Sequence, residues 1–301
     1  MIAFHGHQGR RELDLSMVAG QEQAKKKLQD AATAIRSGNT DVLPMGSVIC
    51  GPVGTGKTFL TTCLAGEVGV PVVMLKNFRS MWQGVTEGNL ERVLNLLQAM
   101  CPIAVMVDEA DAQLGNRSMS GDSGVSNRVF AQIAQFMGNT ELRGKVIWFL
   151  LTSRPDLLPV DLKRQGRAEE HIALFYPETS EERLAMLRAM IKKTGTQLTA
   201  ADAESFFLEH SAGLSGADIE AVLIRARMRS VLKNDGAIDV DDLKAALEDF
   251  IPPSYPTEIE MQNLAAVLEC TSRCLLPAKY REMDRAEVAR RAKELALLIR
   301  E

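Results

Sequence analysis

Short apolar runs alternate with longer segments of helical period through the first part of the chain. The runs cover residues 47–50, 70–75, 103–107, 146–152 and 171–174. Each has the length of a buried strand, and the segments between them carry apolar residues three or four positions apart. Alternation of this kind predicts βαβ units around a parallel sheet. We therefore expect an α/β fold.

The pattern changes after Pro177. Beyond it no strand-like run follows, and helical periods begin at capping signals, Thr179 with Glu182 and Ser215 with Asp218. A cluster of prolines at 252, 253 and 256 then precedes two more amphipathic segments, residues 257–274 and 283–300. These changes predict an N-terminal arm (1–17), a large α/β domain (18–176), a small all-helical lid domain (177–251) and a C-terminal helical extension (252–301).

Composition narrows the class of protein. The chain of 301 residues has a net charge of −4, which argues against a dedicated nucleic-acid binder. Its apolar runs fall far short of the roughly 18 residues that a membrane helix needs, and its first residues contain no apolar core for a signal peptide. The five cysteines show no CxxC spacing, so neither a disulfide framework nor a zinc site is indicated. We expect a cytoplasmic protein without membrane contact.

A phosphate-binding motif follows the first apolar run. Residues 51–58 read Gly-Pro-Val-Gly-Thr-Gly-Lys-Thr, between a buried strand and a helix that we expect to begin near Lys57. Glycines allow such a loop to curl so that backbone N–H groups and the helix N-terminus point at phosphates. Lys57 would supply a cation and Thr58 a ligand for Mg²⁺. The motif therefore predicts nucleotide binding.

Two carboxylates follow the apolar run 103–107. Asp108 and Glu109 stand at the end of this expected strand, downstream of the phosphate loop. One acid in this arrangement lies near Mg²⁺ and a second near an attacking water. We assign Asp108 to the metal and Glu109 to the polarisation of the hydrolytic water.

With these motifs in view, the chain resembles the AAA ATPases of the AAA+ superfamily. The resemblance runs from about Val18 to Pro253, in the branch of hexameric unfoldases and severing enzymes that includes valosin-containing protein, katanin and spastin. It is carried by the phosphate loop and by Val-Asp-Glu-Ala-Asp (107–111), Thr-Ser-Arg-Pro-Asp (152–156), Gln-Gly-Arg (165–167) and Gly-Leu-Ser-Gly-Ala-Asp (213–218). It implies a P-loop NTPase sheet, ATP and Mg²⁺ as cofactors, and ATP hydrolysis.

The resemblance also implies roles for individual residues. Arg164 and Arg167 match the two arginines that reach into the nucleotide site of a neighbouring subunit. Ser153 stands where the family usually has a polar sensor Asn, so it would act through water or share the task with Thr152. The implied nucleotide-binding set comprises Val18, Gly20, Pro52, Val53, Gly54, Thr55, Gly56, Lys57, Thr58, Phe59, Asp108, Gly216 and Ala217.

Residues 81–84 read Met81-Trp82-Gln83-Gly84, where the family places an aromatic pore loop that contacts polypeptide. From the residues alone, Trp82 is equally a core side chain or a grip on extended chain. The resemblance favours the pore contact, although Gln83 stands where the family often has a second hydrophobic residue.

The leading hypothesis is an ATP-driven ring motor that remodels or unfolds proteins. It would form a homo-oligomer, expected to be a hexamer, and engage a protein substrate through the pore loop. Since no recruitment domain precedes Val18, an adaptor protein, the C-terminal extension or further chain would select the substrate. The alternatives are a nucleic-acid-directed loader or helicase-like AAA+ enzyme, which the acidic charge disfavours, and an ATP-dependent assembly scaffold without threading.

Overall fold

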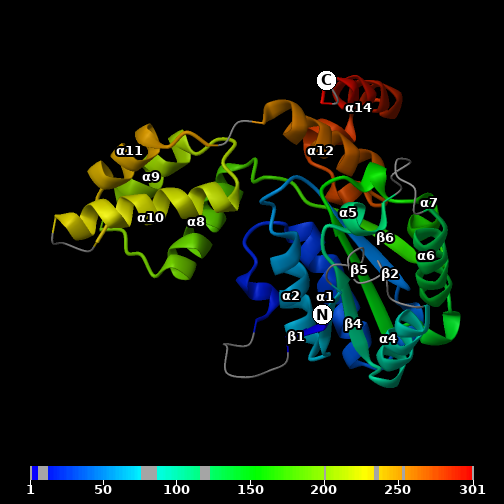
Figure 1. Ribbon diagram of the computed structural model, residues 1–301. Helices are drawn as coiled ribbons and strands as arrows, with labels where there is room; N and C mark the ends of the chain where they lie inside the picture. Colours follow the sequence, from blue (N-terminus) through cyan, green and yellow to red (C-terminus); the bar gives the residue numbers. More distant parts are fainter. Residues whose placement is uncertain are drawn as a thin grey trace.

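A layered α/β body and a separate group of helices make up the protein (Figure 1). The structure is a computed structural model, and it describes residues 2–5, 13–75, 87–115, 123–199, 201–233, 237–252 and 255–299. The sheet lies between helices on its two faces, and the helices of residues 180–249 pack together beside it (Figure 1).

The sheet has the strand order β1-β3-β4-β5-β2-β6. Its strands are β1 (Ile2–His5), β2 (Gly46–Cys50), β3 (Val72–Leu75), β4 (Ile103–Val107), β5 (Val146–Thr152) and β6 (Ala168–Ala173). The ladder from β3 to β6 is parallel throughout, and β1 pairs antiparallel with β3. Strands buried on both faces explain the continuous apolar runs in the sequence. The predicted α/β fold is confirmed.

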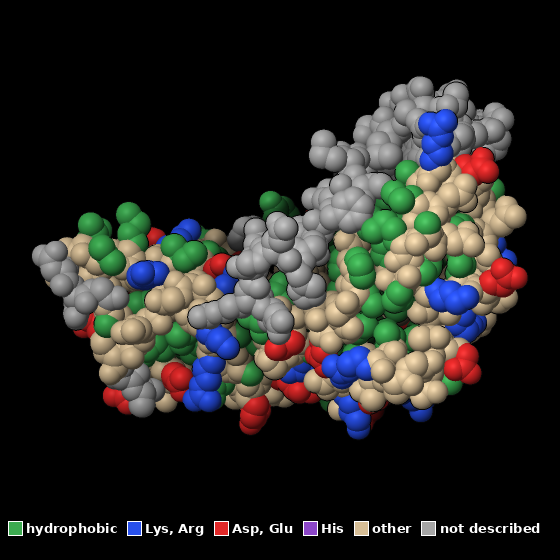
Figure 2. Space-filling view, turned by 90° about the horizontal axis from the view of Figure 1, so that it is seen from below, with side chains coloured by type: hydrophobic (Ala, Val, Ile, Leu, Met, Phe, Trp, Pro, Cys, Tyr) green, Lys and Arg blue, Asp and Glu red, His purple; other side chains and the backbone are tan. Residues whose placement is uncertain are grey.

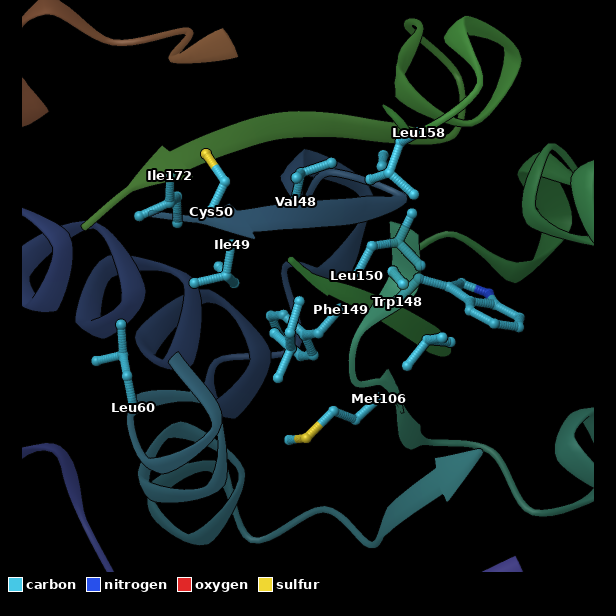
Figure 3. Close-up of a cluster of buried hydrophobic side chains, with 14 of the residues drawn as sticks. Val48, Ile49, Cys50, Leu60, Met106, Trp148, Phe149, Leu150, Leu158 and Ile172 are labelled. Carbon is cyan, nitrogen blue, oxygen red and sulfur yellow. The ribbon is translucent and has the colours of Figure 1, made fainter. Parts of the chain in front are cut away.

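The crossover helices supply the other half of the core. They are α1 (Glu22–Arg36), α2 (Lys57–Val68), α4 (Glu87–Ala99), α5 (Ala110–Leu114), α6 (Ser123–Met137) and α7 (Val160–Lys163), with 3₁₀ turns at Thr40–Val42, Thr140–Leu142 and Pro155–Leu157. In Figure 3, Leu60 of α2 lies on the same side as Ile49 of β2. Trp148 of β5 is fully enclosed and meets Phe136 of α6 edge-on at 6.2 Å between ring centroids. This packing fixes where the carboxyl ends of the strands lie.

The N-terminal segment contributes more than the expected arm. Besides β1, a 3₁₀ turn at Leu15–Met17 buries Leu15 completely. The backbone N–H of Leu15 donates to the carboxylate of Glu67 on α2 at 3.1 Å. A four-residue edge strand has no periodic signal of its own, because its partner supplies all of its pairing. This explains why the sequence pattern did not predict it.

The second group of helices comprises α8 (Ser180–Thr194), α9 (Ala201–His210), α10 (Gly216–Leu232) and α11 (Val240–Asp249). Both predicted capping boxes are present, Thr179 with Glu182 at α8 and Ser215 with Asp218 at α10. These helices enclose a core of their own, distinct from that of the sheet. We call residues 180–249 the lid.

The C-terminal helices pack against the sheet body and not against the lid core. They are α12 (Pro256–Glu269), α13 (Ala278–Arg281) and α14 (Arg285–Leu298), with a 3₁₀ turn at Arg273–Leu275. Buried residues of α12 such as Met261 and Leu264 belong to the same hydrophobic cluster as the strands. Among the described helices, none combines the length and apolar character that crossing a bilayer requires.

The helix predicted over 257–274 ends earlier, at Glu269. After it the chain turns extended, and the backbone N–H of Thr271 donates to the carbonyl oxygen of His171 in β6 at 3.2 Å. The Thr271 hydroxyl in turn accepts the N–H of His171 at 2.9 Å. Pairing with a strand competes with continuation of the helix, and the local period could not reveal this competition.

Candidate active site

The phosphate loop joins β2 to α2 in a tight turn. Gly51, Gly54 and Gly56 have φ of +144°, +80° and +84°, a region that side chains rarely adopt. A Cβ at Gly51 would lie 2.1 Å from the carbonyl oxygen of Leu174. Glycine at these positions therefore follows from the backbone path as well as from the need to approach a phosphate. Helix α2 begins at Lys57, as predicted.

The ammonium group of Lys57 lies within this loop. Its Nζ donates to the carbonyl oxygens of Gly51 and Pro52 at 2.8 and 2.9 Å, and to the hydroxyl of Ser153 at 3.2 Å. Burial lowers the pKa of Lys57 to about 8. The ammonium group is largely desolvated and its hydrogen-bond partners are neutral, so a bound anion would stabilise its charge.

Thr58 and Asp108 meet across the carboxyl ends of β2 and β4. The Thr58 hydroxyl donates to Oδ2 of Asp108 at 2.9 Å. Mg²⁺ takes oxygen ligands, and it is usually held through one or two carboxylates together with substrate phosphates. A hydroxyl and a carboxylate in contact, beside a phosphate loop, therefore fit the donor set that Mg²⁺ requires.

Glu109 is exposed and has an unusual backbone conformation. Its φ of 49° and ψ of 46° are left-handed, which is uncommon for a residue other than glycine. The backbone N–H of Glu109 donates to Oδ1 of Asp108 at 2.9 Å. The carboxylates of Asp108 and Glu109 thus follow β4 in a fixed turn, and strain of this kind is typical of functional positions.

The structure distinguishes the two hydroxyls at the end of β5. The Thr152 hydroxyl is buried, donates to Oδ1 of Asp111 at 2.6 Å and accepts the N–H of Arg154 at 2.8 Å. These contacts occupy it. The Ser153 hydroxyl instead reaches Lys57, so Ser153 is the hydroxyl that faces the phosphate loop.

Two residues that sequence reasoning missed hold the loop at Val53. The Tyr176 hydroxyl donates to the carbonyl oxygen of Val53 at 2.6 Å, and burial raises the pKa of Tyr176 to about 12. From α12, the Gln262 side-chain oxygen accepts the N–H of Val53 at 3.1 Å. No local signal marks Tyr176 or Gln262, because their partner lies far away in sequence.

The lid touches the loop at its glycine. A Cβ at Gly54 would lie 3.1 Å from Oγ of Ser215, the cap of α10. Gly216 follows this cap directly, and Ala217 is exposed. Of the other residues in the implied set, Thr55 is buried and Phe59 is partly exposed.

In the segment before α1, Val18 is buried and Gly20 adopts a φ of +66°. The carbonyl oxygen of Val18 accepts a bond from Lys25 Nζ at 3.0 Å. A cavity of about 280 Å³ adjoins this segment, with Gly20, Tyr176 and Met186 among its lining residues. The segment and the lid helix α8 therefore border one hollow.

Arg164 and Arg167 follow α7, which lies on the side of the sheet away from the lid (Figure 1). Arg164 is 54% exposed, and its Nε is 3.3 Å from Oδ1 of Asp161. Arg167 is only 14% exposed and donates to the carbonyl oxygen of Asp161 at 2.5 Å. Burial and the neighbouring Arg164 lower the pKa of Arg167. Among the described contacts, neither guanidinium touches the phosphate loop of its own chain.

Met81, Trp82, Gln83 and Gly84 lie outside the described residues, so their expected role in a pore loop stays a prediction.

Residues 47–176 match the family model described as "ATPase family associated with various cellular activities (AAA)". The matched range holds the phosphate loop, both carboxylates, Ser153 and both arginines. The chain belongs to the AAA ATPases of the AAA+ superfamily. It is therefore an ATP-binding enzyme that hydrolyses ATP.

Several curated proteins are similar to this AAA ATPase. The Cell division cycle protein 48 homolog of Archaeoglobus fulgidus is 30% identical over 223 residues, which are 71% of this chain and 30% of that protein. The ATP-dependent zinc metalloprotease FtsH 1 of Salinibacter ruber is 27% identical over 80% of this chain and 36% of its own length. The ATP-dependent zinc metalloprotease YME1 homolog of Schistosoma mansoni is 28% identical over 80% and 37%. The chain thus spans about a third of the length of these relatives.

We expect ATP binding to take up protons near pH 8 and not near pH 6.5. With a pKa of about 8, a substantial fraction of Lys57 is neutral at pH 8 before binding, and the triphosphate favours the ammonium form. Calorimetric titration in two buffers of different ionisation enthalpy measures the uptake. A Lys57→Arg variant that still binds ATP should show none, because arginine stays protonated. Binding at pH 8 without uptake in the unmodified chain would contradict this account of Lys57.

Proposed function

We propose that this AAA ATPase works as a hexameric ring that hydrolyses ATP at subunit interfaces and remodels proteins. The observation that carries the proposal is the separation of two charge sets. Lys57, Thr58 and Asp108 gather at one nucleotide site. Arg164 and Arg167 contact Asp161 of α7 instead, and in Figure 1 this helix lies on the side of the sheet away from the lid. Cations placed in this way are suited to the site of an adjacent subunit.

In the proposed reaction, the phosphate loop and Lys57 hold the β- and γ-phosphates. Mg²⁺, held by Thr58 and Asp108, would neutralise charge on the phosphate oxygens. Glu109 accepts a proton as water attacks the γ-phosphorus, and the bond to the β,γ-bridging oxygen breaks to give ADP and inorganic phosphate. Ser153 orients Lys57.

The arginines of the neighbouring subunit would complete the site. A guanidinium pair stabilises the charge that develops on the transferred group, which is worth about 10³–10⁵ in rate in enzymes of this mechanism. Arginine suits the role because its fork is planar and permanently charged. Assembly and hydrolysis would then depend on each other.

A protein substrate is the class that the relatives favour. Two of them are named ATP-dependent zinc metalloproteases, a type of enzyme that acts on polypeptides. Trp82 of the expected pore loop would grip the substrate, and an adaptor protein would select it. A cytoplasmic location remains part of this proposal.

Nucleic acid is a weaker candidate substrate than protein. The chain has a net charge of −4. On the face seen in Figure 2, Lys and Arg side chains alternate with Asp and Glu and form no broad basic surface. A nucleic-acid enzyme gains much of its affinity from contacts between such a surface and phosphates.

Glu109→Gln should abolish turnover and retain ATP. The amide cannot accept the proton of the attacking water, so we expect the hydrolysis rate to fall by about 10²–10⁴ while the phosphate loop still binds. The rate and the nucleotide retained after gel filtration are measured together. Glu141→Gln, which changes an exposed carboxylate in the 3₁₀ turn Thr140–Leu142 before β5, serves as the control and should hydrolyse normally. Turnover at the unmodified rate in Glu109→Gln would remove Glu109 from its role.

Unfolded polypeptide should stimulate the ATPase rate, and DNA should not. Trp82→Ala should lose the stimulation, because the pore loop would no longer grip the chain. A coupled assay with an unfolded protein, single-stranded DNA or duplex DNA makes the comparison. Stimulation by DNA alone would favour a nucleic-acid enzyme, and partner remodelling unchanged in Trp82→Ala would favour an assembly scaffold.

A further inference from the structure

We call residues 164–167, which carry Arg164 and Arg167, the arginine segment. A buried cluster of charges lies beside it, between α7, β6 and the end of α12. Glu269, the last residue of α12, uses both carboxylate oxygens. Its Oε2 is 2.7 Å from Nζ of Lys163, and its Oε1 is 3.0 Å from Nδ1 of His171. The three side chains are only 16%, 12% and 8% exposed. A single carboxylate thus joins two basic side chains away from solvent.

Hydrogen-bond acceptors face both ring nitrogens of His171. Nδ1 faces the carboxylate and the main-chain oxygen of Glu269, and Nε2 faces the carbonyl oxygen of Ala168 at 2.8 Å. These groups are hydrogen-bond acceptors, so they favour the imidazolium form of the ring. Burial opposes this charge, but the hydrogen bonds to Glu269 and Ala168 outweigh it and raise the pKa of His171. Burial likewise opposes the charge of Glu269, and its bonds from His171 and Lys163 nevertheless lower its pKa.

The two partners of Glu269 stand at the two ends of the arginine segment. Lys163 immediately precedes Arg164, and it also donates to the carbonyl oxygen of Pro155 at 2.8 Å. His171 holds the carbonyl oxygen of Ala168, which immediately follows Arg167. The carboxylate of Glu269 therefore fixes the chain before Arg164 directly, and it fixes the chain after Arg167 through the ring of His171.

The same helix also contacts the nucleotide site. Gln262, about two helical turns before Glu269, accepts the N–H of Val53 in the phosphate loop at 3.1 Å. Buried residues of α12 pack on the strand cluster between these two contacts. In Figure 1, α12 follows the lid and lies over the sheet body. Its position is therefore set by the phosphate loop at one end and by the arginine segment at the other.

We propose that Glu269 is a positioning residue for the trans-acting arginines, and that it holds segment 164–167 in the geometry that the neighbouring site needs. The proposal rests on the proposed function, because it assigns Arg164 and Arg167 to the next subunit. A stabilising role alone does not account for the cluster well, since buried ion pairs contribute little net stability compared with apolar packing. Misplacement of a catalytic group by about 1 Å can cost about 10²-fold in rate.

Rings assembled from two kinds of variant subunit distinguish a positioning role of Glu269 from a role in stability alone. Acceptor subunits carry Arg164→Ala and Arg167→Ala, which leaves their own phosphate loop intact. Donor subunits carry Lys57→Ala, which leaves their arginines intact. Each kind alone should be inactive, and the mixture should hydrolyse ATP through donor arginines in acceptor sites.

Glu269→Gln is then introduced into one kind of subunit at a time. In the donor it should lower the activity of the mixture by about 10- to 100-fold, because one amide oxygen cannot serve both Lys163 and His171. In the acceptor, whose arginines are already absent, it should change that activity by less than about threefold. Glu260→Gln is the matched control, since Glu260 lies on the same helix but pairs with Arg291 of α14 at 2.9 Å. It should cause no such asymmetry.

Equal losses from Glu269→Gln in donor and acceptor would mean a structural role and would overturn the proposal, as would no loss in either. If Glu269→Gln subunits fail to assemble in gel filtration, Lys163→Met in the donor replaces them and should give the same asymmetry. Full activity of rings with Arg164→Ala and Arg167→Ala in every subunit would instead refute the proposed function, and this proposal with it. The two failures appear in different arms of the experiment.

Discussion

The ammonium group of Lys57 is a largely desolvated positive charge, and the phosphate loop and the end of β5 are arranged around it. Its ammonium group is held by carbonyl oxygens of its own loop and by the Ser153 hydroxyl, all of them neutral. Burial lowers its pKa to about 8, so the folded chain is prepared for an anion before one arrives. Left-handed turns that favour glycine, and parallel strands that end at one edge of the sheet, keep that charge in place.

Distant parts of the chain converge on the loop that carries this charge. The lid reaches Gly54 through Ser215, while Tyr176 and Gln262 bind the two backbone polar groups of Val53. A change in the conformation of the loop on nucleotide binding would therefore alter its contacts with both the lid and α12. Helix α12 continues to Glu269, beside the arginines that we assign to the next subunit. Helix α12 thus contacts both the phosphate loop of its own subunit and the segment that carries the arginines for the next subunit.

What the sequence could predict was local in origin. The runs 103–107 and 146–152 became β4 and β5 with the expected bounds, because strands buried on both faces are apolar at every position. The capping boxes at Thr179 and Ser215 formed because their partners lie three residues away. The phosphate loop and Asp108 were found from spacing, and their contact through Thr58 follows from parallel strands ending together.

What the sequence could not predict depends on distant partners. Strand β1 forms only against β3, and α12 ends at Glu269 because the following residues pair with β6. Gln262 and Glu269 look like ordinary polar positions on an amphipathic helix until the fold brings them to Val53 and Lys163.

We propose that each buried lysine site is completed by arginines of another subunit. The most direct test is the ATPase rate per subunit across a dilution series, with the assembly state measured in parallel. We expect the rate per subunit to fall by about 10³-fold or more as rings dissociate. A rate that stays constant down to isolated subunits would show that each subunit hydrolyses ATP without its neighbours.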